Sequence, residues 1–486
     1  MTDRPTALRG IGSPSWGAVA ALLLLCFAIR LPLLSSPGFA IDEKQFVTWS
    51  YQSIQGGIAA PYDVMPGTHP PRRWCNYPPV YLYVLAALGR LLPLLTGGAH
   101  SLDQSTWLSF VYGAPTAATS TIHALFKLPA LLADAMTCAL LFRWLARRAT
   151  GDEAADSQAA RTGGHSQSAV TTAWCIAALY AVSPTILWDS LVWGQVDSIH
   201  TLFLLLSLQA AWDRRTAAMS AWAVVAILTK PHSFMLAPLW AACIVRELHA
   251  GAWNELRRAA WIATILVVAL AGPFAAAGVA DGVAESLFGA VGRYPFTHLN
   301  GFSLWFLLNP LERPMLGMAG ALYQSDTAAL LGLPAVTPRA AGLLLLGSVA
   351  LLVFFRVLRD PPRRSLGMAA RLLPLAFFVL PTQIHERYLF PAVALWAWSW
   401  GTDARTGNGL LPWWIGWAAL HTILFINMVW VFPGPAGWFA EGSFATFLHG
   451  SIGGRPIGWW CAAGLLILMA ASLRRGEVEH TERARP

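Results

Sequence analysis

Charged residues are scarce in this sequence: they make up 12% of its 486 residues, whereas 56% are hydrophobic. A soluble globular domain carries about 25% charged residues, so the composition argues against a soluble protein. The apolar residues form runs of about 18–22, long enough to cross a hydrocarbon core as helices. Because backbone groups in lipid must bond internally, these runs predict an all-α, polytopic transmembrane helical bundle of about 11–13 spans.

Lysine and cysteine are also rare. Only Lys44, Lys127 and Lys230 are lysines, so thirty of the 33 basic residues are arginines. The formal net charge of +8 is attributed to arginine-rich cytoplasmic loops, not to nucleic-acid binding. The six cysteines form no disulfide or metal-type spacing, and a soluble nucleotide-binding domain with a glycine-rich loop is absent.

Arginine clusters orient the predicted spans. If the spans are as given below, the clusters all fall on one side, which is then cytoplasmic. Segment 78–97 is also long and apolar enough to cross, which would reverse every later loop. Arg90 and Pro93 in its interior favour an interfacial helix on the outer face instead. The predicted spans are 16–35, 123–143, 169–187, 198–212, 217–230, 232–246, 259–277, 338–357, 366–382, 388–402, 411–430 and 457–473.

We expect a single transmembrane domain over 1–486. Its first extracytoplasmic loop, 36–122, would carry interfacial helices, and 278–337 would form a second large outer loop. The polar stretch 150–168 is predicted to be a flexible cytoplasmic loop.

Acidic residues gather on the predicted outer side. Asp42 and Glu43 directly follow the first span, where a solvated carboxylate is the ordinary structural explanation. The short turn between two later spans holds Asp189, Gln195 and Asp197. Asp197 could simply cap the next helix, but capping does not account for its two polar neighbours. Carboxylates at a membrane interface are candidates for function.

Basic residues gather on the same side. The turn containing His385, Glu386 and Arg387 lacks the Gly, Asn or Ser of an ordinary tight turn. Arginine offers a planar fork to phosphate oxygens, whereas the structural alternative is a Glu–Arg pair joining two helices. Lys230 and His232 flank a proline where a helix is expected to break. This outward positive charge opposes the positive-inside bias and indicates an anionic ligand.

Several motifs occur in the order of a known superfamily: an acidic first loop, YPP, HALFKLPALLADA, WGQVD, TKPH, NGFSLW and HERY. Together they resemble the GT-C superfamily of membrane glycosyltransferases over most of the chain. The sequence is similar to bacterial relatives of the second mannosyltransferase of GPI-anchor synthesis and to dolichyl-phosphate-glucose-dependent glucosyltransferases. The resemblance implies inverting transfer of a hexose, mannose or glucose favoured, from a polyprenyl-phosphate sugar donor. The acceptor would be lipid-linked, a glycan or a protein, on the extracytoplasmic side of a bacterial-type inner membrane.

The resemblance also implies roles for individual residues. The catalytic base would lie in the first outer loop, where Asp42 matches and Glu43 is the alternative. His385, Arg387, Lys230 and His232 would contact the donor phosphate. Acceptor positioning or site organisation would fall to Asp189, Gln195, Asp197, Glu386, Tyr77 and Asn300.

We expect no metal and no other cofactor, and a monomer surrounded by membrane lipid. A transporter or flippase of lipid-linked glycans is the alternative function. It would place charges along a central pathway and show internal repeats, and neither feature is evident in the sequence.

Overall fold

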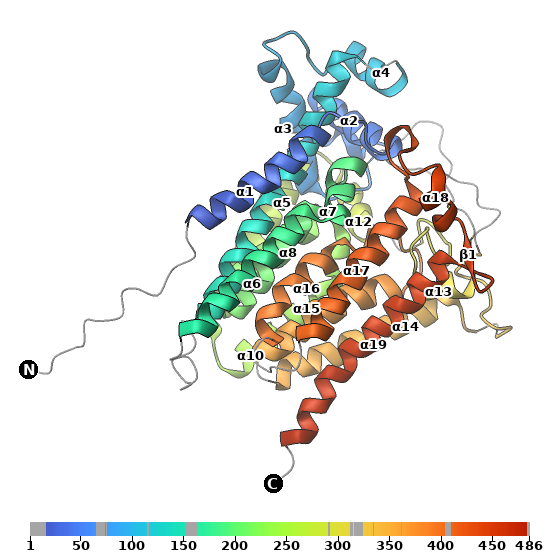
Figure 1. The fold of residues 1–486 in the computed structure, drawn as a ribbon. Helices are drawn as coiled ribbons and strands as arrows, with labels where there is room; N and C mark the ends of the chain where they lie inside the picture. The colour runs from blue at the N-terminus through green and yellow to red at the C-terminus, as the bar shows by residue number, and fades with distance from the viewer. Residues whose placement is uncertain are drawn as a thin grey trace, which may run out of the picture.

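The computed structural model is an almost entirely helical protein, as the sequence predicts (Figure 1). A small hairpin of strands β1 (Ser451–Ile452) and β2 (Arg455–Pro456) is the one paired sheet in the described part of the chain. The structure describes residues 16–64, 73, 75–113, 116–150, 163–289, 292–311, 314, 324–333, 335–360, 362–403 and 410–483.

A helix coincides with each of the predicted spans. The helices are α1 (Trp16–Arg30), α5 (Ala117–Thr150), α6 (Gly163–Val182), α8 (Asp197–Trp212), α9 (Thr216–Thr229), α10 (Ala237–His249), α11 (Trp253–Ala276), α14 (Pro338–Arg359), α15 (Pro362–Val379), α16 (Phe390–Asp403), α17 (Leu410–Val431) and α19 (Ile457–Arg483). Among the described residues, six helices are long and apolar enough to cross a membrane. Helix α6 begins inside the predicted loop 150–168, and residues 151–162 of that loop lie outside the described part.

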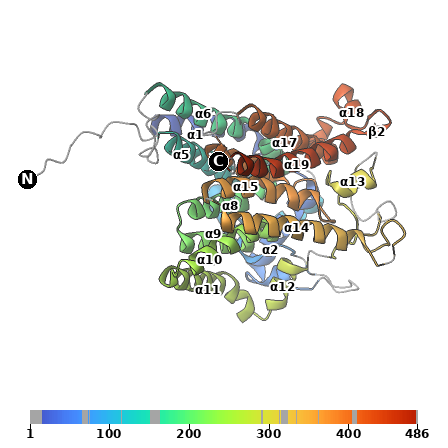
Figure 2. The same cartoon turned by 90° about the horizontal axis from the view of Figure 1, so that it is seen from below.

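Two bundle helices expose most of their apolar surface. Only 11% of the apolar window of α11 and 17% of that of α14 is buried, so most of their apolar side chains point outward. Apolar surface on this scale is stable in lipid but not in water. Figure 2, which views the bundle from below, shows α11 along one edge and α6 at the opposite edge. The chain is therefore an integral membrane protein.

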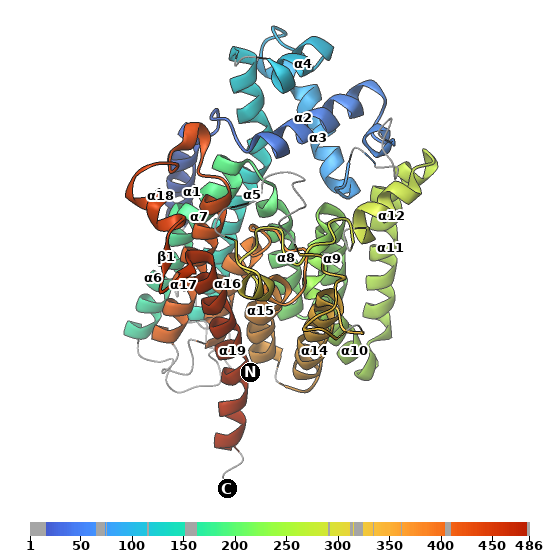
Figure 3. The same ribbon diagram turned by 90° about the vertical axis from the view of Figure 1, so that its right-hand side faces the viewer.

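A layer of shorter helices covers one end of the bundle (Figures 1 and 3). It contains α2 (Ala40–Gln55), α3 (Pro79–Leu95) and α4 (Gln104–Tyr112) from the first predicted loop, with α12 (Ala280–Phe288) and α18 (Gly442–Leu448). Two short helices, α7 (Pro184–Leu187) and α13 (Leu304–Leu308), also connect bundle helices. We call the layer formed by α2, α3, α4, α12 and α18 the cap. The assignment of α3 as an interfacial helix remains a prediction.

Helix α3 packs closely on α2 within the cap. The Ser50 hydroxyl of α2 donates a hydrogen bond of 2.7 Å to the Leu85 carbonyl of α3. One turn further along α3, a Cβ atom added at Gly89 would lie 2.5 Å from the Ser50 Oγ. The two helices can therefore approach this closely only because residue 89 has no side chain.

Arginines mark the end of the bundle opposite the cap. The last turns of α5, α10 and α14 carry Arg147, Arg148, Arg246, Arg356 and Arg359, and these helices run away from the cap (Figure 1). The bundle therefore has an arginine-rich end and a capped end, as the sequence predicts.

Candidate functional site

A π-helical turn leads into the WGQVD motif (residues 193–197). Residues Trp188–Trp193 form this turn directly after α7, and Gly194 follows with φ 82°, a left-handed conformation that favours glycine. The chain folds back so that the backbone amide of Gln195 donates to the backbone carbonyl of Asp189 at 2.9 Å. Helix α8 then starts at Asp197. π-Turns of this kind are frequent at functional sites.

The first loop docks on this turn. The Phe39 amide donates to the Trp193 carbonyl at 2.8 Å, which places Asp42 in the first turn of α2 against the motif. The Asp42 Oδ2 atom accepts hydrogen bonds from the Trp193 indole at 2.8 Å and from the side-chain amide of Gln195 at 2.5 Å. The Tyr77 hydroxyl donates to Gln195 Oε1 at 3.2 Å. Three candidate residues, Asp42, Tyr77 and Gln195, thus lie together.

The neighbouring carboxylate, Glu43, has different partners. Its Oε2 atom accepts from the Gly38 amide at 2.7 Å and lies 2.9 Å from His123 Nδ1. The Lys127 ammonium lies 3.5 Å from Oε1 and donates to the Ser36 carbonyl at 2.5 Å. Glu43 therefore fastens the start of α2 to α5.

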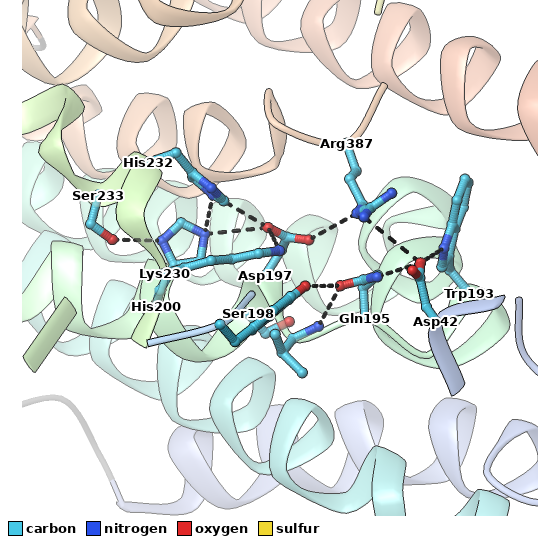
Figure 4. A network of polar contacts seen from close by, with 12 residues as sticks. Asp42, Trp193, Gln195, Asp197, Ser198, His200, Lys230, His232, Ser233 and Arg387 are labelled. Carbon is cyan, nitrogen blue, oxygen red and sulfur yellow. Dashed lines mark hydrogen bonds and ion pairs between the residues drawn. The ribbon is translucent and has the colours of Figure 1, made fainter. Parts of the chain in front are cut away.

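Arg387 connects the two acidic parts of the site. Its guanidinium lies 3.7 Å from Asp42 Oδ2 and 4.0 Å from Asp197 Oδ2, and it donates to Glu386 Oε1 at 2.7 Å. It also lies over the Trp193 ring, 5.5 Å from the centroid. Burial opposes its charge, but Asp42 and Glu386 outweigh that effect and raise the Arg387 pKa well above its usual value. Figure 4 shows this network from close by.

Glu386 is also held in its charged form. Burial alone would raise its pKa, but the hydrogen bond from His385 and the charge of Arg387 bring the pKa below the usual value. His385 is partly exposed, with 27% of its side chain accessible, and its ring lies beside those of Tyr294 and Tyr388. His385 and Arg387 therefore extend from the same short turn toward different partners: His385 contacts tyrosine rings, and Arg387 contacts carboxylates.

Asp197 anchors a second, fully buried cluster. Its Oδ1 atom lies 2.7 Å from the Lys230 ammonium, 3.3 Å from His200 Nε2 and 3.5 Å from His232 Nε2. The break predicted near Pro231 supplies the lysine and one histidine: α9 ends at Thr229, and a 3₁₀ helix (Pro231–Leu236) precedes α10. The sequence did not single out His200.

Asp326 braces the turn that carries Arg387. Asp326 is fully buried and receives both arms of Arg339, at 2.8 and 3.0 Å, and hydrogen bonds from Thr382 and Gln383. Asn300 lies against the other side of the turn. The amides of its neighbours Leu299 and Gly301 donate to the Ile384 carbonyl, at 3.0 and 3.1 Å.

Asn300 therefore supports the turn through its backbone. Its carbonyl accepts a 2.8 Å hydrogen bond from Asn427 of α17, which in turn accepts from the Phe302 amide at 3.0 Å. Its φ of 65° is a left-handed value that asparagine tolerates better than most residues.

Asp189 stands apart from the rest of the site. It is fully buried, and neither side-chain oxygen has a hydrogen-bond partner among the described residues. Its carboxyl group interacts electrostatically with Asp197, Lys230 and Arg387. The structure thus gathers the candidate residues predicted from the sequence at the capped end, with Asp189 beside the network.

A buried polar cluster beneath the site was missed by sequence reasoning. Arg30 and Asp134 are both fully buried and lie 3.5 Å apart. Ser198, next to Asp197, donates to Asp134 at 2.7 Å and lies 2.7 Å from the Ser190 hydroxyl. One sequence signal was available: the apolar run HALFKLPALLADA contains the carboxylate Asp134, and carboxylates are rare in membrane spans.

Part of the chain matches a model of a known protein family. Residues 75–288 match the family model described as GPI transamidase subunit PIG-U, a family of membrane proteins. The match contains the WGQVD turn, Lys230 and His232 but neither Asp42 nor Arg387. It covers less than half of the chain. No curated protein matches the sequence.

Proposed function

We propose that the protein is an inverting, polyprenyl-phosphate-sugar-dependent glycosyltransferase. It would transfer a hexose, mannose or glucose favoured, to a lipid-linked, glycan or protein acceptor on the extracytoplasmic side. One observation carries the proposal: the carboxylate of Asp42 lies 3.7 Å from the Arg387 guanidinium, although 345 residues separate them. The proposed base and the proposed phosphate-binding cation, the two groups that this reaction needs, would therefore be neighbours at the capped end.

Asp42 suits the role of base better than Glu43. Both hydrogen bonds to Asp42 reach Oδ2, and Oδ1 accepts none from the described residues. Its side chain is 14% exposed, compared with 7% for Glu43, which is already engaged by His123 and Lys127. In the proposed step, Oδ1 takes the proton of the acceptor hydroxyl as that oxygen bonds to the anomeric carbon.

The leaving group departs on the opposite face of the sugar. The bond between the anomeric carbon and the phosphate oxygen breaks, and polyprenyl phosphate leaves with the electron pair. Arg387, with His385 at the rim, would stabilise the developing phosphate charge without transferring a proton. The network already fixes the guanidinium between Asp42, Asp197 and Glu386, so little reorganisation is needed during the reaction.

Lys230 and His232 take a supporting role in this proposal. The sequence suggested direct contact with the donor phosphate, but both side chains lie on Asp197 Oδ1. Asp197 Oδ2 faces Arg387 at 4.0 Å, so Lys230 and His232 would position the phosphate-binding arginine through Asp197. Tyr77, Gln195, Asp189, Glu386 and Asn300 would organise the site.

Transfer from synthetic donors tests the proposal. Purified protein is supplied with polyprenyl-phosphate mannose, glucose or arabinose and a panel of lipid-linked, glycan and peptide acceptors. We expect Asp42→Asn to lower the rate by about 100-fold or more, the usual size of a general-base contribution. Asp103→Asn is the matched control, because Asp103 is a carboxylate of the same cap and asparagine also serves as a helix N-cap.

The result depends on both variants remaining folded. Each should elute as one peak and unfold at the same temperature as the original protein. Full transfer activity of a folded Asp42→Asn variant would refute Asp42 as the base. Loss of activity in both variants would show that the change does not act through the proposed site.

A second candidate function rests on the family match. The family name describes a subunit of an enzyme complex, so the protein would act as a membrane subunit without transferase activity of its own. Purification from mild detergent distinguishes the two. Co-elution of a stoichiometric partner, with no transfer from any donor, would favour the subunit, whereas an active monomer would favour the transferase.

A further inference from the structure

Three atoms that could bind a metal ion lie close together: one carboxylate oxygen of Asp197 and one imidazole nitrogen each of His200 and His232. The distances between them are 3.3 Å from Asp197 Oδ1 to His200 Nε2, 3.5 Å from Asp197 Oδ1 to His232 Nε2, and 2.8 Å between the two imidazole nitrogens. Ligands of a tetrahedral zinc ion, with bonds of about 2.0–2.1 Å, are about 3.3 Å apart. Two of the three distances already match, and the third would need to open by about 0.5 Å.

The hydrogen bonds around His200 leave a lone pair on its Nε2 atom, which lies beside Asp197 and His232. The Ser233 hydroxyl donates its hydrogen to the Ala226 carbonyl at 3.0 Å, so its oxygen accepts from His200 Nδ1 at 3.1 Å. A proton on Nδ1 leaves Nε2 of the neutral ring free to act as a ligand. A hydrogen bond of this type orients metal-bound histidines in proteins.

The other two ligands are also held in place. The His232 ring stacks on Tyr388, with centroids 4.8 Å apart at 27°, which fixes its orientation. Asp197 begins α8, and its carboxylate is fully buried. Figure 4 shows both imidazoles and the carboxylate meeting in one place. Side chains locked by packing give the fixed geometry that a metal site requires.

Negative charge exceeds positive charge in this region. Four carboxylates lie in or beside the network, against two permanent cations. Burial and the charge of Asp197 raise the pKa of Asp189 well above its usual value, so the other three carboxylates leave an excess of one negative charge, which a divalent cation would offset. Buried charges that remain uncompensated are costly. The carboxylates are Asp42, Asp189, Asp197 and Glu386, and the cations are Lys230 and Arg387.

We infer that Asp197, His200 and His232 bind a divalent transition-metal ion, with zinc as the preferred metal. Two imidazoles and one carboxylate suit zinc and leave one coordination position open. The Lys230 ammonium, 2.7 Å from Asp197 Oδ1, need not leave, since a carboxylate oxygen can accept a hydrogen bond while it binds a metal. The ion would join the start of α8 to the broken segment between α9 and α10. The expectation of a metal-free protein would then be wrong.

Metal analysis tests this inference without any activity assay, so it can fail independently of the proposed function. The full chain is expressed in zinc-supplemented medium and purified with a tag that contains no histidine. Mass spectrometry of the elements measures zinc, manganese, iron, cobalt, nickel and copper per chain. We expect about one zinc ion per chain. A metal-free protein, even after incubation with excess zinc, would overturn the inference and leave a hydrogen-bonded histidine pair.

Variants locate the ion. With free zinc buffered near the dissociation constant of the original protein, His200→Gln and His232→Gln should each lose most of the bound zinc, because removing even an outer-shell partner weakens binding about 10–100-fold. His421→Gln is the matched control, since His421 is a partly buried histidine bonded to Ser183 elsewhere in the bundle. Zinc retained by both His200→Gln and His232→Gln would place the ion elsewhere and refute the site.

X-ray absorption keeps the test decisive if the variants do not fold. At the zinc edge, the original protein should show nitrogen or oxygen neighbours at about 2.0–2.1 Å and the outer-shell scattering of two imidazoles. A spectrum without imidazole scattering would exclude this cluster.

Discussion

The buried pair Arg30–Asp134 makes a sharp prediction about stability. Both side chains are fully buried, with Arg30 Nε 3.5 Å from Asp134 Oδ2. The carboxylate also accepts from Ser198 at 2.7 Å and from Tyr180 at 3.4 Å. Arg30 donates to the Ala181 carbonyl at 2.5 Å. These bonds join α1, α5, α6 and α8 at one point beneath the site.

Asp134→Asn keeps the shape of the side chain and removes its charge. The Arg30 guanidinium would then be buried without a counter-ion, and breaking a buried pair in this way costs about 3–5 kcal/mol. That is a large part of a typical free energy of unfolding of about 5–15 kcal/mol. Titration with sodium dodecyl sulfate in mixed micelles, followed by the fluorescence of the 24 tryptophans, measures the loss.

The double variant Arg30→Met with Asp134→Leu is the informative comparison. Replacing both members of a buried pair by apolar groups is often nearly neutral, so much of the lost stability should return. The reasoning would be refuted if Asp134→Asn cost less than about 1 kcal/mol, the value of an exposed pair. It would also be refuted if the stability losses of Arg30→Met and Asp134→Leu, measured separately, added up to that of the double variant, since residues in contact should show a coupling energy.

Three further predictions concern the supports of the site. Glu43→Gln should lower the free energy of unfolding by about 1–3 kcal/mol, because buried Lys127 loses its carboxylate, and should show this in the same detergent titration. Burial lowers the pKa of His298 to about 4, so the unfolded chain binds more protons between about pH 4 and 6.5. Stability should therefore rise with pH across that range by up to about 1.4 kcal/mol per unit, and His298→Gln should flatten the profile. Gly301→Ala would place its Cβ 2.6 Å from the Ile384 carbonyl, so thermal unfolding should begin at a lower temperature, whereas Gly347→Ala, in open space within α14, should not lower it.

Sequence patterns predicted the helices well because each depends on local composition. Apolar runs predicted where every bundle helix lies, although α5 and α19 extend well beyond their predicted spans, and arginine clusters separated the two ends. The broken helix around Pro231 followed from the missing backbone donor of proline. The larger boundary differences lie at the start of α6, at both ends of α5 and at the end of α19, where the sequence is more polar and a helix can extend beyond the membrane.

Long-range partners could not be predicted from the same patterns. Asp42 and Glu43 are adjacent, yet one meets Trp193 and Gln195 and the other meets His123 and Lys127. Their directions depend on the angle at which α2 docks, which no local signal encodes. His200 lies one turn after Asp197 in an apolar helix, so only its contact with His232, from another segment, reveals its setting.

The bracing of the Arg387 turn was hidden for a similar reason. Asp326 lies in an irregular segment far from that turn along the chain, and its partners Arg339 and Thr382 come from different elements. Only the folded chain shows that this carboxylate supports the turn.

The pairing of the acidic residues has a consequence for biosynthesis. Asp42 is satisfied by Trp193 and Gln195, and Asp197 by Lys230, all of which enter the membrane before Arg387. At about 5–20 residues per second, Arg387 follows Lys230 roughly 8–30 s later. The nascent chain can therefore hold a stable acidic half of the site during that interval. Arg387 then joins a prepared surface, and α17, whose Asn427 supports the Arg387 turn through Asn300, follows it into the membrane.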